Sequence, residues 1–270
     1  MDSRDTTTAS ETRDKTKAPV PLSAVIIAKD AEATIERALK SVRFCDEIVV
    51  SVDSSSVDAS ESIARRIADR VKSHEWNGYG PVKRAAVAFA SGRWILSIDA
   101  DEEVTPELAG AICDAISQDP PPCAAYRIRR RTRFLGRRMR HGDWGRDRVV
   151  RLFQKDKGEF TDDTVHESVI APGHKPILEG LLLHEGDQDI SSYLLRLDRY
   201  TTLAAKALHR SGRRSSVVSI IFRPLFKFLQ AYFIRLGLLD GWQGLILAWY
   251  SAVYVFTKYS KLRMLSRGSE

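Results

Sequence analysis

The chain has 270 residues, of which 43% are hydrophobic and 29% are charged. This length fits one large α/β domain plus an accessory segment, and it excludes two ordinary catalytic domains. The composition excludes fibrous and broadly disordered proteins. The three cysteines show no CxxC spacing, which argues against a disulfide framework or zinc knuckle and favours a reducing compartment.

The net charge of +7 is concentrated in two zones. Residues 196–270 carry 13 Lys and Arg against three Asp and Glu, and residues 127–151 carry 11 Arg against two Asp. The remaining chain is therefore acidic. Basic zones beside an acidic body indicate anionic partners such as phosphates, lipid headgroups or nucleic acid.

Residues 1–20 are predicted to form a disordered leader, because they are rich in Thr, Ser and charged side chains. They contain no apolar core, which excludes a secretory signal peptide. Strands then alternate with helices, with strands predicted at 22–28, 47–52, 71–75 and 94–98 and helices at 35–42, 59–67 and 82–90. This alternation predicts a parallel sheet of right-handed βαβ units whose ligands bind at the carboxyl ends of the strands.

A helix is predicted at 105–116, opening on Thr105 and Pro106, and the proline run 120–122 interrupts the chain after it. The pattern then changes, with strands predicted at 124–131, 148–153, 165–170 and 177–183 and no long helices between them. This half is expected to form the mixed, acceptor-facing part of the sheet. From Ser191 the pattern is helical to the end.

Two strand ends carry carboxylates. Asp53 ends the second strand and can accept hydrogen bonds from a nucleobase or ribose, whereas Asp58 is better explained as a helix cap. Asp99 and Asp101 follow the fourth strand, separated by one residue. Such a pair can converge on Mg²⁺ or Mn²⁺ and a diphosphate, although an acidic turn that caps the next helix has the same pattern.

The chain resembles glycosyltransferase family 2, of the GT-A fold, and more narrowly the lipopolysaccharide-core β-1,4-glucosyltransferase type. The matching stretches lie at 22–28, 46–58, 76–90, 94–102, 137–153 and 165–167. The resemblance implies an inverting enzyme that takes a nucleoside-diphosphate sugar, with Asp53 and Lys83 at the donor. It further implies that Asp99 and Asp101 hold the metal and diphosphate.

The sequence departs from the family pattern around the donor. Lys29, Asp30 and Ala31 replace a frequent Asn-Glu-Glu, Ser55 and Val57 replace a Gly and a Thr, and only Lys83 matches a frequent Gln-Lys-Asn. These changes leave donor identity open, so UDP-glucose is an expectation from the resemblance alone.

The tripeptide Val165-His166-Glu167 matches a family feature and supplies the expected general base, Glu167, which would remove the proton of the acceptor hydroxyl. His166 would then contact metal, phosphate or acceptor. A surface Glu and a packed His form the alternative interpretation.

Residues 141–148 (HGDWGRDR) mix residue types that a core strand or helix does not use. Trp144 can stack on a sugar, Asp143 can accept hydroxyl hydrogen bonds, and Arg146 or Arg148 can bind phosphate oxygens. A surface hairpin explains the stretch equally well. The arginines of 127–140 are predicted to form a solvated basic face. His184, at a strand end, is either a further metal ligand or a hydrogen-bonded terminal residue.

The C-terminal segment is predicted to form a helix on a membrane surface. Residues 217–239 are mostly apolar, with Arg223, Lys227 and Arg235 on one helical face. Residues 241–257 are uncharged and are interpreted as an interfacial or re-entrant helix, with a packed helix and a membrane span as alternatives.

The expected organisation is therefore a leader at 1–20, a GT-A catalytic domain at 21–190 with a mostly parallel, helix-flanked sheet, and an amphipathic, membrane-associating helical tail at 191–270. The expected acceptor is a glycolipid or lipopolysaccharide core, and the expected location is cytoplasmic, on the inner face of the cytoplasmic membrane. Nucleic acid is not expected as a partner. Two alternatives are a non-catalytic nucleic-acid-binding module and a sugar nucleotidyltransferase.

Overall fold

A computed structural model describes residues 21–161, 167–186 and 190–267. The strands are β1 (Leu22–Ala28), β2 (Glu47–Asp53), β3 (Arg70–His74), β4 (Trp94–Asp99), β5 (Glu102–Val104), β6 (Ala125–Phe134), β7 (Arg137–Arg138), β8 (Arg148–Gln154), β9 (Glu159–Phe160), β10 (Val169–Ile170) and β11 (Leu182–Glu185). The helices of the sheet domain are α1 (Ile35–Ser41), α2 (Ser60–Ile67), α3 (Tyr79–Phe89), α4 (Pro106–Ser117) and a short 3₁₀ turn (Trp144–Arg146).

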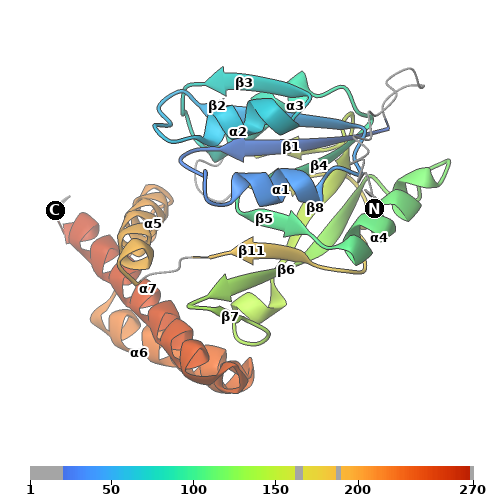
Figure 1. Cartoon of the computed structure of the whole chain (residues 1–270). Coiled ribbons are helices and arrows are strands. Elements are labelled where there is room, and N and C mark those ends of the chain that lie inside the picture. Colours follow the sequence, from blue (N-terminus) through green and yellow to red (C-terminus); the bar gives the residue numbers. More distant parts are fainter. Residues whose placement is uncertain (1–20, 162–166, 187–189, 268–270) are drawn as a thin grey trace, which may run out of the picture.

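One sheet organises the first two thirds of the chain, in the order β3-β2-β1-β4-β8-β6-β11-β5, with β7 attached to β6. Strands β3, β2, β1 and β4 are mutually parallel, whereas β8 is antiparallel to both β4 and β6. The predicted α/β class is confirmed, including the change from a parallel half to a mixed half (Figure 1).

Strand β1 is buried along its whole length and apolar except for Ser23, because both of its faces are covered. Leu22 and Ile26 join the core that α1, α2 and α4 close, while Val25 and Ile27 join a second core that includes Val82 of α3. The alternation follows from strand geometry, in which successive side chains point to opposite faces. Parallel strands buried on both faces read as continuous hydrophobic runs, which is why this half was predictable.

The second half matches its prediction less closely. Strand β5 was not predicted, since its three residues are too few to show a period. The strand expected at 177–183 lies at Leu182–Glu185 instead, and of the strand expected at 165–170 only Val169–Ile170 is observed, with 165 and 166 outside the described residues. These short strands depend on their partners, since β11 lies between β6 and β5 and β10 pairs with β9.

Helix α4 begins where the sequence predicts. The Thr105 hydroxyl accepts a hydrogen bond from the Leu108 backbone N–H at 3.3 Å, and Pro106 occupies the first turn. The same hydroxyl accepts from the Leu181 backbone N–H at 3.2 Å, so the cap also fixes the chain just before β11.

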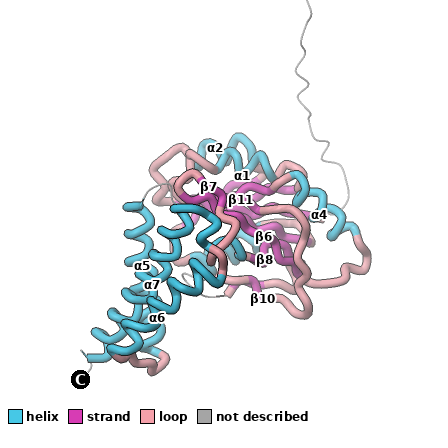
Figure 2. Tube along the Cα trace, turned by 90° about the horizontal axis from the view of Figure 1, so that it is seen from below, coloured by secondary structure: helices cyan, strands magenta, loops and turns pink. Residues whose placement is uncertain are grey.

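The C-terminal segment is helical, as predicted, and lies beside the sheet as a separate layer (Figures 1 and 2). It comprises α5 (Ile190–Arg210), α6 (Val217–Leu229), a π-helical turn (Gln230–Ile234), a 3₁₀ turn (Gly237–Asp240) and α7 (Gly241–Arg267). By length and composition the stretch 217–234 is apolar enough to cross a membrane, with 6% of it buried.

Candidate active site

The turn after β4 is fixed by a buried carboxylate. Asp99 is the last residue of β4, and its backbone N–H donates a hydrogen bond of 2.9 Å to Glu102 Oε2. Glu102 is buried and also accepts from Arg130 Nη1 at 3.1 Å and from Arg151 Nη2 at 3.0 Å. The turn therefore holds Asp99 and Asp101 in a defined position at the carboxyl end of the parallel strands.

Asp99 lies between two cations. Its Oδ1 is 2.7 Å from Lys83 Nζ, and its Oδ2 accepts a hydrogen bond from Arg151 Nη2. Burial alone would raise the pKa of Asp99, but the charges of Arg151 and Lys83 hold that pKa well below its usual range. Asp99 is therefore a carboxylate whose two oxygens are already engaged.

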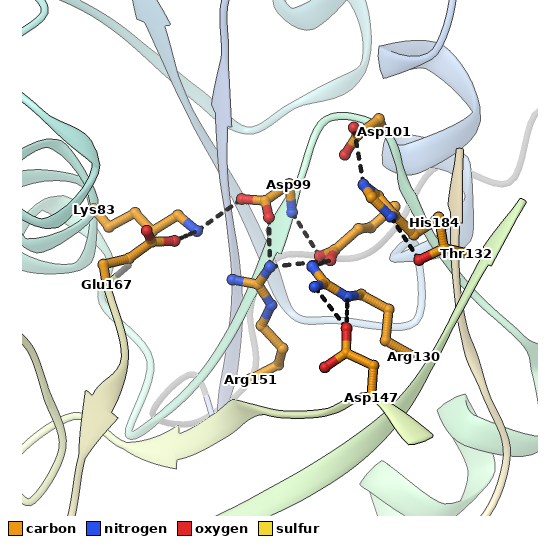
Figure 3. A network of polar contacts seen from close by, with 10 residues as sticks. Lys83, Asp99, Asp101, Arg130, Thr132, Asp147, Arg151, Glu167 and His184 are labelled. Carbon is orange, nitrogen blue, oxygen red and sulfur yellow. Dashed lines mark hydrogen bonds and ion pairs between the residues drawn. The ribbon is translucent and has the colours of Figure 1, made fainter. Parts of the chain in front are cut away.

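Lys83 links Asp99, at the end of β4, to Glu167, the predicted general base. Its Nζ donates to Glu167 Oε1 at 2.7 Å and is equally close to Asp99, so one ammonium bridges the strand end and the predicted base (Figure 3). The Lys83 side chain is only 1% exposed and does not line the pocket. The donor contact that the resemblance implies for Lys83 stays a prediction, and in this arrangement its ammonium pairs with Asp99 and Glu167.

Asp101 and His184 form a second pair on the other side of Asp99 (Figure 3). His184 Nε2 lies 3.2 Å from Asp101 Oδ2, while His184 Nδ1 lies 3.0 Å from Thr132 Oγ1. Burial would lower the pKa of His184, yet the hydrogen bond and charge of Asp101 raise it overall. An imidazole held at Nδ1 by a hydroxyl presents Nε2 in a fixed direction.

The Asp101 and His184 pair fits a divalent cation. The Asp101 side chain is 41% exposed, and the contact of the Thr132 hydroxyl with His184 Nδ1 orients the ring so that Nε2 can bind a metal. No group of three or more His, Cys, Asp or Glu side chains able to hold a metal occurs among the described residues. A cation here would need oxygen ligands from a bound substrate or from water, as Mg²⁺ commonly does.

Asp53 is buried at the end of β2, as predicted. Its Oδ1 accepts hydrogen bonds of 2.8 Å from the Ser55 backbone N–H and hydroxyl, and its Oδ2 is 3.2 Å from Lys29 Nζ. Burial would raise the pKa of Asp53, but these partners lower it overall. Lys29 lines the pocket and Asp53 does not, so Asp53 supports the wall from behind.

A pocket of about 1150 Å³ joins these groups. Asp99, Asp101, Glu167 and His184 line its sheet side, and residues of α5 and α7 line the opposite side. The second wall is aromatic and basic, with Tyr193, Arg196, Arg199, Tyr200 and Tyr254. The volume slightly exceeds the range of roughly 300–1,000 Å³ that is usual for ligand sites, and it admits more than one substrate group.

The predicted acceptor residues divide into two sets. Trp144 and Arg148 line the pocket, with the Trp144 ring 5.5 Å from Phe134, whereas Arg146 and Asp143 do not line it. Asp143 instead accepts hydrogen bonds from Ser251 Oγ at 3.0 Å and from Arg235, and it pairs with Lys227 at 3.0 Å. Asp143 therefore attaches the tail to the sheet domain. His166 lies outside the described residues.

Sequence reasoning missed Arg130, Arg151 and Asp147. Arg130 Nη2 pairs with Asp147 Oδ2 at 2.6 Å, and Arg130 and Arg151 both pair with Glu102 (Figure 3). The run 127–140 is thus a solvated basic face only in part, because Arg130 points into the site. The available signal was Arg151 itself, a charge inside the otherwise apolar stretch 149–153.

A family model described as glycosyl transferase family 2 matches residues 23–175, more than half of the chain. The chain is 31% identical to the lipopolysaccharide core biosynthesis glycosyltransferase LpsC of Rhizobium meliloti, over 90% of this chain and 92% of that protein. It is also 29% identical to an uncharacterised glycosyltransferase of Rickettsia typhi, over 91% and 87% of the two chains.

Among solved structures, S. aureus TarS aligns over 93% of this chain and 92% of that chain, with a TM-score of 0.44 and 13% identity. Glucosyl-3-phosphoglycerate synthase of Mycobacterium tuberculosis, solved with Mn²⁺, UDP and phosphoglyceric acid, aligns over 42% and 44%, with a TM-score of 0.35 and 23% identity. The family model and the curated relatives agree, and the chain belongs to glycosyltransferase family 2 and is a glycosyltransferase.

Proposed function

We propose that the protein is an inverting, divalent-metal-dependent glycosyltransferase that moves a sugar from a nucleoside-diphosphate donor, with UDP-glucose as the expected donor, to a lipopolysaccharide-core or other lipid-linked acceptor. One observation carries the proposal. A single pocket brings together a pair suited to a cation, Asp101 and His184, and a carboxylate suited to proton removal, Glu167, on opposite sides of Asp99 (Figure 3).

Asp101 and His184 would hold Mg²⁺ or Mn²⁺, which when bound neutralises the charge that develops on a departing diphosphate. Asp99 has both oxygens engaged by Lys83 and Arg151 and is better placed to orient these cations than to bind the metal itself. We therefore assign the metal to Asp101 and His184 and a positioning role to Asp99. Asp53 would orient Lys29 at the nucleoside end of the pocket.

Glu167 would act as the base. The acceptor hydroxyl gives its proton to a Glu167 carboxylate oxygen, its oxygen bonds to the anomeric carbon, and the bond from that carbon to the phosphate oxygen breaks with the electron pair leaving on the nucleoside diphosphate. Lys83 positions Glu167 through its 2.7 Å contact. Attack from the side opposite the leaving group inverts the anomeric centre.

The acceptor would enter from the side of α5 and α7. Trp144 and Tyr193 offer rings for stacking on sugar faces, and Arg148 offers a planar fork for a phosphate or carboxylate. The likeness to a lipopolysaccharide core biosynthesis enzyme supports a lipopolysaccharide-core acceptor. The pocket wall is shared between the sheet domain, 21–190, and the helical tail, 191–270, which we treat as the two functional parts.

The tail would place the enzyme on the inner face of the cytoplasmic membrane. Helix α6 packs against α7 and buries Pro224, while Ile221, Phe222, Leu225 and Phe226 are more than half exposed. A helix with one packed face and one apolar exposed face lies in the interface plane. Among the three interpretations of 241–257, the contacts of α7 with α5 and α6 favour a packed helix.

The test is Glu167→Gln, compared with Glu179→Gln, which alters a carboxylate outside the pocket. We expect Glu167→Gln to bind UDP-sugar and metal as the wild type does and to lose transfer by roughly 10²–10⁴-fold, the usual contribution of a general base. Donor binding is followed by calorimetry and transfer by release of UDP. Transfer near the wild-type rate would show that another group takes the proton.

A further inference from the structure

A basic, partly aromatic groove lies between α6 and α7, apart from the active-site pocket. It is open to solvent and has a volume of about 600 Å³, and its lining includes Phe222, Arg223, Phe226, Lys258 and Tyr259. The lining residues include no Asp or Glu. Lys227 adds a third cation at one edge.

Aromatic rings, not carboxylates, hold the two main cations. Arg223 Nη1 donates to the Tyr259 hydroxyl at 3.2 Å, and its guanidinium carbon lies 4.9 Å from the centre of the same ring. Lys258 Nζ lies 5.3 Å from the Tyr259 ring and 5.2 Å from the Tyr254 ring. Such cation–π contacts orient a cation and leave its charge uncompensated.

The acidic side chains of the C-terminal helices already have partners within the protein. Residues 190–267 contain two, of which Asp198 pairs with Lys261 at 2.7 Å and Asp240 accepts hydrogen bonds from the His141 backbone at 2.7 Å and side chain at 3.1 Å. Lys227 shares Asp143 with Arg235. Among the described residues, no carboxylate lies within ion-pair distance of Arg223 or Lys258, so no acidic side chain neutralises the positive charge of these two residues.

The charges that surround Lys258 also favour an anion in the groove. Burial lowers the pKa of Lys258, and the like charges of Arg223 and Lys227 lower it further. A phosphate between these side chains would relieve this repulsion and replace water lost by burial. Phosphate matches the planar donor fork of arginine and the point charge of lysine.

The apolar residues that line the groove indicate which kind of phosphate-bearing ligand fits it. Val218, Phe222 and Phe226 line the groove and are each more than 60% exposed, so a ligand seated among the cations adjoins an apolar surface. A free phosphate or sugar phosphate would gain nothing from that surface, whereas a phospholipid presents an anion joined to acyl chains.

We propose that the α6–α7 groove binds the headgroup phosphate of an anionic phospholipid between Arg223 and Lys258 while Phe222 and Phe226 insert beside its acyl chains. This inference rests on the membrane association proposed above and adds lipid selectivity to it.

The test measures sedimentation of the full-length protein with vesicles of phosphatidylcholine alone and with vesicles that also contain phosphatidylglycerol. The double variant Arg223→Gln/Lys258→Gln is compared with Lys206→Gln/Arg210→Gln, which removes the same charge from exposed positions on α5. Each cation near an anionic surface changes partitioning roughly fivefold. We expect the groove variant to lose about 25-fold of its preference for phosphatidylglycerol and to keep its binding to phosphatidylcholine.

The control double variant should retain most of the preference, and Arg223→Lys should also retain it because the charge is kept. Equal losses in both double variants would overturn the groove site in favour of a general basic field. Equal binding of the wild type to both vesicle types would overturn lipid selectivity and leave membrane association standing. Wild-type binding to neither vesicle would refute membrane association itself.

Discussion

Lys83→Met tests whether one buried ammonium holds the active site together. Methionine preserves the apolar stem and removes the charge that lies 2.7 Å from both Asp99 and Glu167. Removing one partner of a buried ion pair costs about 3–5 kcal/mol, because the remaining charge stays buried. Arg151 still neutralises Asp99, so we expect the lower end of that range, about 3 kcal/mol in the free energy of unfolding.

A loss of about 3 kcal/mol lowers the midpoint of thermal unfolding by roughly 6–12 °C for a chain of this size. Denaturant titration gives the free energy, and scanning calorimetry gives the midpoint. The matched control is Lys40→Met, which removes an ammonium 2.7 Å from Glu36 on an exposed helix surface and should change stability by less than about 1 kcal/mol.

A double-mutant cycle separates the partners of Lys83. Glu167→Gln removes the charge that Lys83→Met leaves unpaired, so the double variant should be more stable than the sum of the single effects by about 1–2 kcal/mol. Additive effects would show that Lys83 and Glu167 are not coupled. If Lys83→Met unfolds like Lys40→Met, the bridging role assigned to Lys83 is wrong.

Two further predictions concern the fold. Asp143→Asn removes the charge shared by Lys227 and Arg235 and should expose α6 to limited proteolysis. Burial alone would raise the pKa of Asp143, but its partners lower that pKa overall. The stability that Asp143 contributes is therefore present above the ordinary Asp pKa of about 3.9 and is lost as pH falls through the lowered pKa of the folded state. The acid-induced loosening seen in the wild type should therefore be smaller in Asp143→Asn, and equal pH profiles would count against this contact. Gly180→Ala should destabilise by about 3 kcal/mol in urea titration, because its φ is +82° and an added Cβ would lie 2.3 Å from the Leu108 backbone N. Gly173→Ala, with φ of +74° and open space, should cost only about 1 kcal/mol, and an equal loss in both would contradict the steric argument.

The parallel half of the sheet could be predicted because its signal is local. Leu22–Ala28 and Glu47–Asp53 are short, mostly apolar and β-branched stretches that end at turns, and Thr105 with Pro106 marks a helix start. The mixed half could not be predicted as well, because β5 and β11 are short and form through pairing, β5 with β11 and β11 also with β6. Pairing between residues about 80 positions apart leaves no periodic trace in the sequence.

The active site shows the same difference between local sequence signals and contacts made by long-range packing. Asp99, Asp101 and Glu167 could be identified from strand ends and family motifs, but their partners could not. That Lys83 bridges two carboxylates 16 and 84 positions away, and that Glu102 gathers Arg130 and Arg151, are consequences of packing. Asp143 was assigned to the acceptor on composition alone, and the folded chain instead pairs it with tail cations that sequence reasoning placed at a membrane.

We propose above that Asp101 and His184 hold the cation that a nucleotide-sugar donor needs. The most direct measurement is calorimetric titration of UDP-glucose, with UDP-N-acetylglucosamine in parallel, into the full-length protein with Mn²⁺ and then with chelator. We predict Mn²⁺-dependent binding to the wild type and a loss of at least about tenfold in affinity in both Asp101→Asn and His184→Asn. Mn²⁺-dependent binding of unchanged affinity in Asp101→Asn would contradict the account.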